Sequence, residues 1–135
     1  MPLTNAACAG LLNRFGSKTS LFDTLQDLYA AASTTTPSKD GTGFTEPVGN
    51  NYSRRLIDPS ELDAATVADP SLLTNNATLA HNAASGSWGT ITYVGLFTAA
   101  SSGTLLGFGQ LSEAKAIGLN DVLRYTVGEL DLTLT

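Results

Sequence analysis

The sequence is poor in charged residues, which make up 14% of its 135 positions, and it contains one cysteine and one histidine. The single cysteine, Cys8, excludes a disulfide within the chain. One cysteine and one histidine do not supply the closely spaced ligands that a zinc site needs. No apolar run approaches the ~20 residues of a membrane-spanning helix. The first residues also lack the positive charge that precedes the apolar core of a signal peptide. We therefore expect neither a membrane anchor nor secretion.

Basic residues are few and scattered. The formal net charge is -5, and no cluster of lysine and arginine provides the footprint that a phosphate backbone requires. Binding to nucleic acid is therefore not expected. Residues 38–41 and 120–121 are too poor in carboxylates for a calcium loop and are expected to form ordinary turns. We expect no metal and no cofactor.

Candidate catalytic groups are sparse. His81 is the only histidine, and its neighbours do not form a nucleophile elbow of the G-x-S-x-G kind. A hydrogen-bonded structural role or a surface position is the better prediction for it. Glu129 and Asp131 share one face of a predicted strand, where they flank an apolar alternation that is typical of solvated edge positions. We expect no catalytic residue and no enzymatic activity.

The chain has the length of a single domain, residues 1–135, which begins with a helix within residues 1–17. Thr4 or Asn5 can cap this helix, and Gly16 can end it. Cys8, Leu11, Leu12 and Phe15 recur at helical spacing and predict a buried apolar stripe, in which Cys8 packs as a small hydrophobic residue.

The next segments mix helix, loop and strand signals. Leu21, Leu25 and Leu28 recur at helical spacing, and the three alanines at positions 30–32 also favour a helix. Residues 34–51 are rich in threonine, proline, glycine, serine and asparagine, which is typical of a loop. This loop is longer than a plain connector, so we expect a functional arm that is mobile in the isolated protein and protected after assembly. A strand over residues 52–57 follows, and Asp58 with Pro59 can start a helical turn.

The clearest β region is the core over residues 87–135. Residues 90–98 and 104–111 predict a hairpin, and residues 114–117 predict a further short strand. The apolar phase changes between Tyr125 and Leu130, which predicts a bulge or break at residues 128–129. The expected fold class is mainly β, as an antiparallel β-sandwich or barrel with a short N-terminal helix.

Two blocks carry the most specific pattern. Residues 45–54 read TEPVGNNYSR, and residues 88–97 read WGTITYVGLF. Together they resemble a family of short tailed-bacteriophage virion proteins, whose members pair a TEP-x-G-x-x-Y-x-R loop with a later WGT-V/I-T-x-x-G-I/L-F/Y strand. The resemblance spans most of the chain but fits residues 58–79 poorly. It implies that residues 28–34 form a strand directly before the long loop.

Members of this family are often labelled tail-fibre proteins. The resemblance implies a small, non-enzymatic virion component that is made in the host cytoplasm and built into the particle, and it does not decide between head and tail. Trp88 is the candidate anchor of the core, because it offers the largest area for burial. The candidate interface residues lie in the long loop and in the strand after it: Phe44, Glu46, Tyr52, Arg54 and Arg55.

Three functions remain open. The first is a capsid decoration, or cement, protein, a homo-oligomer that binds the major capsid protein through its long loop and termini. A low-charge surface suits such partly buried contacts. The second is a tail-fibre or baseplate component at low copy number. The third is a carbohydrate-binding module for host recognition, which would use exposed aromatic residues among Tyr29, Phe44, Tyr52 and Tyr93.

Overall fold

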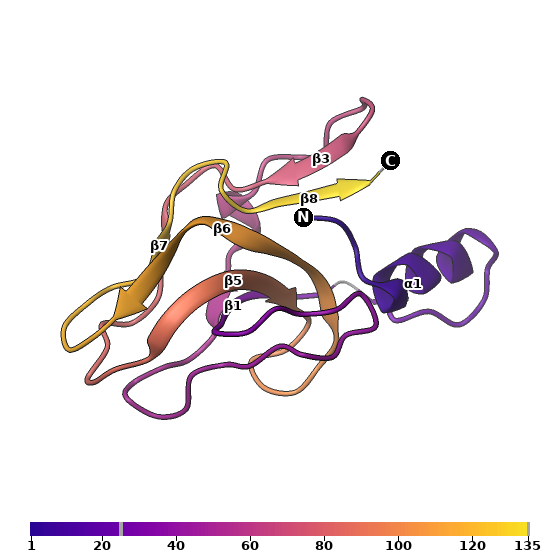
Figure 1. Cartoon of the computed structure of the whole chain (residues 1–135). Helices are drawn as coiled ribbons and strands as arrows, with labels where there is room; N and C mark the ends of the chain where they lie inside the picture. Colours follow the sequence, from indigo (N-terminus) through magenta and orange to yellow (C-terminus); the bar gives the residue numbers. More distant parts are fainter. Residues whose placement is uncertain (25, 135) are drawn as a thin grey trace.

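The computed structural model describes residues 1–24 and 26–134 (Figure 1). Within them the elements are α1 (Asn5–Phe15), β1 (Leu28–Ser33), β2 (Arg55–Ile57), the 3₁₀ helix η1 (Pro59–Glu61), β3 (Ser71–Thr74), β4 (Leu79–Ala80), β5 (Gly89–Phe97), β6 (Leu105–Ile117), β7 (Arg124–Tyr125) and β8 (Asp131–Leu134). All the paired strands are antiparallel. The mainly β fold with a short N-terminal helix is confirmed, and the sheets of the described residues do not close into a barrel.

The largest sheet has four strands in the order β2-β1-β5-β6. Strands β5 and β6 form a long hairpin, and β1 pairs with the other edge of β5 so that Ala31 lies opposite Gly95. Ala30, Ala31 and Ala32 of β1 are completely buried. Because these side chains are small, other groups can approach both faces of the sheet at β1.

Two small ribbons, β3–β8 and β4–β7, pack over one face of this sheet. Their shared core joins Ala32 and Val94 of the sheet to Leu79 of β4 and Tyr125 of β7. Trp88, which is 4% exposed, lies in the same core just before β5. The result is a two-layer arrangement in which the layers are held together by aromatic and aliphatic side chains.

Helix α1 begins and ends where the sequence predicts. The Thr4 hydroxyl accepts a hydrogen bond from the Ala7 amide and caps the first turn, and Gly16 follows the last residue. Thr4 is itself buried and donates its hydroxyl proton to the Leu105 carbonyl, which fixes the helix to the start of β6.

The predicted buried face of α1 is wrong. Leu12 and Phe15 are 69% and 75% exposed, and Cys8 is exposed rather than packed in the core. The buried helical residues are Ala7 and Gly10. A Cβ atom at Gly10 would lie 2.8 Å from the Phe22 ring, so the chain that follows the helix packs directly on its small residues.

The segment between α1 and β1 is not helical where the structure describes it. Ser20 and Asp23 form a turn, in which the Ser20 amide donates to the Asp23 carboxylate at 3.0 Å. Leu25, which contributes to the helical spacing, lies outside the described residues. Strand β1 confirms the strand that the family resemblance implies.

Most predicted features of the later chain are confirmed. The β5–β6 hairpin forms, η1 begins at a capping box on Asp58, and Gly128 has a φ of 79° at the predicted break. Strand β6 runs unbroken through residues 112–113, where the sequence predicts a gap, and the short strands β3 and β4 were not predicted. No helix among residues 1–24 and 26–134 has the length and apolar character needed to span a membrane.

Candidate functional site

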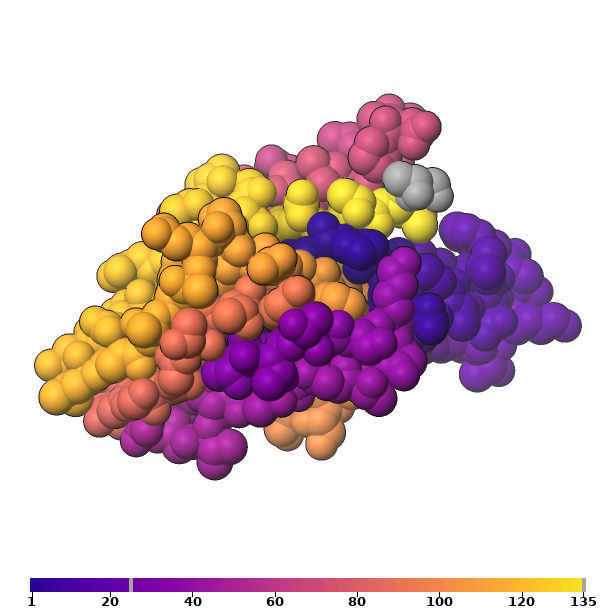
Figure 2. Space-filling model, in the orientation of Figure 1, coloured from indigo at the N-terminus to yellow at the C-terminus, as the bar shows by residue number. Residues whose placement is uncertain are grey.

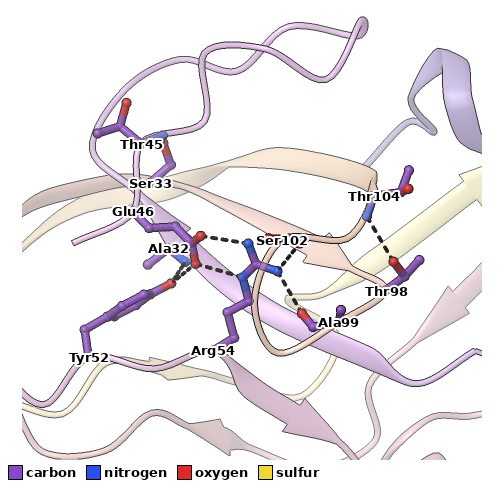
Figure 3. Close-up of polar contacts among 10 residues, drawn as sticks. All are labelled: Ala32, Ser33, Thr45, Glu46, Tyr52, Arg54, Thr98, Ala99, Ser102 and Thr104. Carbon is purple, nitrogen blue, oxygen red and sulfur yellow. Dashed lines mark hydrogen bonds and ion pairs between the residues drawn. The ribbon is translucent and has the colours of Figure 1, made fainter. Parts of the chain in front are cut away.

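Arg54 follows the TEP loop and directly precedes β2, which covers only the last three residues of the strand predicted over residues 52–57 (Figure 3). The guanidinium donates two hydrogen bonds to Glu46, at 3.0 Å from Nε to Oε1 and 2.8 Å from Nη2 to Oε2. Its Nη1 donates at 2.7 Å to the carbonyls of both Ala99 and Ser102. The guanidinium carbon also lies 3.7 Å from the centre of the Phe97 ring. Arg54 therefore joins the loop before it to the turn between β5 and β6.

Tyr52 completes this group, which we call the Arg54 clamp (Glu46, Tyr52, Arg54 and Phe97). The Tyr52 hydroxyl donates to Glu46 at 2.7 Å and accepts from the Ala32 amide at 3.0 Å. The Tyr52 side chain thereby attaches the loop to β1 through the backbone amide of Ala32. The clamp thus connects the long loop, β1 and the β5–β6 turn.

The surroundings of Glu46 keep its carboxylate ionised at neutral pH. Burial alone would raise the pKa of Glu46, but the hydrogen bonds and the charge of Arg54, helped by Tyr52, outweigh it and lower this pKa below its usual value. Burial, reinforced by the nearby Glu46 carboxylate, raises the pKa of Tyr52. The Arg54 side chain is 7% exposed and that of Glu46 is 25% exposed, so water screens their ion pair only partly.

Both loops of the clamp are also closed at their bases. The Thr34 amide donates to the Thr45 carbonyl at 3.0 Å, and the Thr45 amide donates to the Ser33 hydroxyl at 3.0 Å. In the β5–β6 turn, the Thr104 amide donates to the Thr98 hydroxyl at 3.0 Å. The clamp therefore lies between two loops that have their own internal hydrogen bonds.

Phe44 points inward from the long loop. Its ring packs edge-on against Phe97, with 5.1 Å between ring centres, and it joins a second apolar cluster on the sheet face away from the main core. A Cβ atom at Gly95 would lie 2.5 Å from the Phe44 ring, so the ring rests on the glycine backbone. The long loop is thus a cover for this face of the sheet.

Arg55 faces a different part of the molecule. It forms an ion pair of 2.8 Å with Glu61 of η1, and this pairing is the main cause of a lowered pKa of Glu61. Both candidate interface arginines are therefore paired with carboxylates of their own chain. Their use in an interface stays a prediction, as it does for Phe44, Glu46 and Tyr52.

A buried polar group lies next to the clamp. His81 is 4% exposed, with Nδ1 at 3.0 Å from the Ser53 carbonyl and Nε2 at 2.9 Å from the Tyr125 hydroxyl. Burial lowers the pKa of His81. The Trp88 indole nitrogen donates to the Asn50 carbonyl at 2.8 Å, which anchors the end of the long loop. His81 and Trp88 thus hold structure together, in agreement with the structural role predicted for His81.

An open groove of about 370 Å³ lies beside the clamp, between residues 46–48 and 100–102. Pro47, Val48 and Ser101 are among the residues that line it, and Val48 at its rim is 93% exposed. Within the described residues, no three histidine, cysteine, aspartate or glutamate side chains gather as metal ligands would. The groove offers a surface for contact, and the clamp fixes the shape of its two walls.

Sequence reasoning found three of the four clamp residues and missed Phe97 and the Ala99 and Ser102 carbonyls. The signal for the carbonyls was weak: Gly103 permits the φ of 73° that the turn requires, but it does not show which residue the turn contacts.

The family model described as Podophage GP4 fiber I protein gp80 matches residues 2–133. No match was found among curated proteins.

Proposed function

The chain belongs to the family described as Podophage GP4 fiber I protein gp80 and is a structural protein of a bacteriophage virion; on this premise we propose that it acts in a tail fibre. The observation that carries the proposal is the extent of the match, which covers residues 2–133 and so nearly the whole domain. Capsid decoration, the first expectation from the sequence, is the competing function.

We propose that its role is mechanical and not enzymatic. The ionisable groups of the signature are engaged within the chain, since Glu46, Tyr52 and Arg54 bond to one another and to backbone carbonyls. Such a network holds loops in place instead of presenting a free acid, base or nucleophile. This arrangement suits a part that transmits force or fixes a position in an assembly.

We propose that the groove beside the clamp contacts another virion protein. Its walls, residues 46–48 and 100–102, are joined by Arg54 and need little ordering when a partner binds. A surface that is already ordered loses less conformational entropy on association. The exposed Val48 at the rim supplies an apolar contact of the kind that becomes buried in interfaces.

The test is the copy number of the protein in purified virions, measured by quantitative mass spectrometry against the major capsid protein. We expect far fewer copies than capsid subunits, and immunogold labelling at the tail. A copy number comparable with that of the capsid protein, and label over the head, would instead support decoration. Absence from the particle would refute both.

Host recognition through carbohydrate has less support from the geometry. Phe44 is packed against Phe97, and Tyr29, Tyr52 and Tyr93 are each only partly exposed. Sugar-binding platforms present an open aromatic face. A glycan array with the purified protein tests this alternative, and specific binding would add recognition to the structural role.

A further inference from the structure

Helix α1 carries an apolar stripe on the side that faces solvent. Cys8, Leu12 and Phe15 follow one another at spacings of four and three residues, so they share one face of the helix. Leu12 is 69% exposed, Phe15 is 75% exposed and Cys8 is exposed. The helix and the residues just after it form a lobe at one end of the molecule (Figure 2). A stripe of large apolar side chains in such a position is typical of a protein contact.

An apolar groove lies beside the stripe, since Ala7 and Leu11 of α1 line it and Phe15 follows Leu11 by four residues. It has a volume of about 340 Å³ and is lined by thirteen residues, none of them charged. Leu11 of α1 forms part of it, together with Leu72 of β3 and Leu132 of β8. The stripe and the groove are therefore adjoining apolar surfaces, which meet between Leu11 and Phe15 of the helix.

The charges around these two surfaces are opposite in sign. Residues 1–22 contain two basic residues, Arg14 and Lys18, and no acidic one; Arg14 forms an exposed ion pair of 3.7 Å with Asp23, which follows this segment. Residues 58–71 contain four acidic residues and no basic one. The acidic segment reaches the groove, because Ala65 and Ser71 line it. Among the described residues, the ion pairs include neither Asp63 nor Asp69. A helix of one molecule that approaches the groove of another would bring its basic residues towards this acidic segment.

The size of the helix favours a reciprocal contact. With eleven residues, α1 is about 16 Å long, and one face of it cannot supply the roughly 800 Å² per partner of a stable interface. In a two-fold arrangement each molecule both inserts a stripe and receives one, which doubles the contact. We propose that the partner is a second copy of this chain, with the Leu12–Phe15 stripe of each copy seated in the apolar groove of the other.

The first test is the molar mass of the full chain over a concentration series, by light scattering coupled to size-exclusion chromatography. The wild-type protein should be a dimer or a higher oligomer built from such pairs. Leu12→Gln and Phe15→Gln should each raise the dissociation constant roughly tenfold or more, as expected for residues at the centre of an interface. Both side chains are largely exposed, so circular dichroism should show unchanged folding.

Leu119→Gln is the matched control, because Leu119 is 68% exposed, lies in the turn after β6 outside both the stripe and the groove lining, and should leave the oligomer intact. A monomeric wild-type protein at all concentrations would overturn the proposal. An oligomer that survives the Leu12→Gln/Phe15→Gln double substitution would also overturn it, because the contact would then lie elsewhere. Neither result bears on copy number in the virion, so the tail-fibre proposal stands or falls separately.

Cys8 gives an independent readout of the same surface. It is the only cysteine in the chain and lies on the proposed contact face. A bulky maleimide should label it slowly in the wild-type oligomer and several-fold faster in the Leu12→Gln variant. Equal labelling rates in wild-type protein and variant would count against a contact at this face.

Discussion

At the scale of single residues, Arg54 is the side chain with the most demanding surroundings. Its planar guanidinium contacts a carboxylate through two nitrogens, two carbonyls through a third, and an aromatic face. Lysine has one compact ammonium group and cannot reproduce this set of contacts, although it keeps the charge. The geometry of the donors, more than the charge, should therefore decide the stability of the clamp.

Arg54→Lys should lower the free energy of unfolding by about 2 kcal/mol, because it leaves partly buried acceptors without donors. The control is Arg55→Lys, which changes a more exposed ion pair with Glu61 and should cost less than about 1 kcal/mol. Urea unfolding at neutral pH measures both values. Equal losses for the two variants would contradict the special role of Arg54.

His81 is a second residue whose surroundings set a measurable property. A carbonyl only accepts hydrogen bonds, so Nδ1 carries the proton that it donates to Ser53, and Nε2 accepts from the Tyr125 hydroxyl. Protonation of Nε2 would replace this acceptor with a donor inside a buried cluster. The fold therefore favours the neutral ring, in agreement with the lowered pKa of His81.

The stability of the protein should fall on mild acidification for this reason. Unfolded histidine has a pKa of about 6.5, and the folded value is lower. Between these two pH values the unfolded chain binds more protons, so the unfolding free energy decreases as the pH drops through that window. Denaturant unfolding of wild-type protein and of His81→Gln at several pH values from neutral to mildly acidic measures the effect. The variant should lack this part of the slope, and parallel curves would refute the assignment.

At the scale of elements, the outer face of β5 and the long loop fit together through Gly95 and Phe44. Gly95→Ala should cost about 1–3 kcal/mol, since the new Cβ would overlap the Phe44 ring. In a Phe44→Ala background the ring is gone and only the flexible Leu105 side chain, 2.8 Å from the new Cβ, has to move, so the same glycine substitution should cost less. A double-mutant cycle by chemical denaturation should therefore give a coupling energy of about 1–2 kcal/mol. Additive effects would show that the two residues do not touch in solution.

The elements also show which features could be predicted from sequence. The ends of α1 and η1 depend on capping groups a few residues away, so Thr4, Gly16 and Asp58 were sufficient to place them. The buried face of α1 depends on what packs against it. Ala7 and Gly10 face inward because they let Phe22 approach the backbone, and no periodicity of large apolar residues could indicate this.

The candidate site was predictable to a similar extent. Glu46, Tyr52 and Arg54 stand close together in the sequence, and the signature selected them as a group. Phe97 and the carbonyls of residues 99 and 102 come from a hairpin that lies 43 to 48 residues after Arg54 in the chain. Their contact with Arg54 depends on the pairing of β1 with β5, which places the hairpin turn beside the loop.

At the scale of the whole molecule, the clamp connects three segments that are distant in the sequence. Glu46 belongs to the long loop, the Ala32 amide to β1, and Ala99 to the β5–β6 turn (Figure 3). The sequence suggested an arm that becomes ordered on assembly. In the structure, hydrogen bonds close the base of this loop and Phe44 covers a sheet face, which leads us to predict an ordered loop base in the isolated protein.

Hydrogen exchange should therefore be slow at the base of the loop in the isolated protein. The amides of Thr34, Ser38 and Thr45 each donate within the chain, at distances from 2.8 to 3.0 Å, and should be as protected as in the virion. Arg54→Lys should speed exchange in residues 34–51 and 98–104 together, because one side chain ties both segments, whereas Arg55→Lys should change neither. Mass spectrometry of peptides from these segments gives the rates. Rapid exchange of the wild-type loop base, with protection gained only in the particle, would mean that the loop becomes ordered on assembly and that the clamp closes only in the virion.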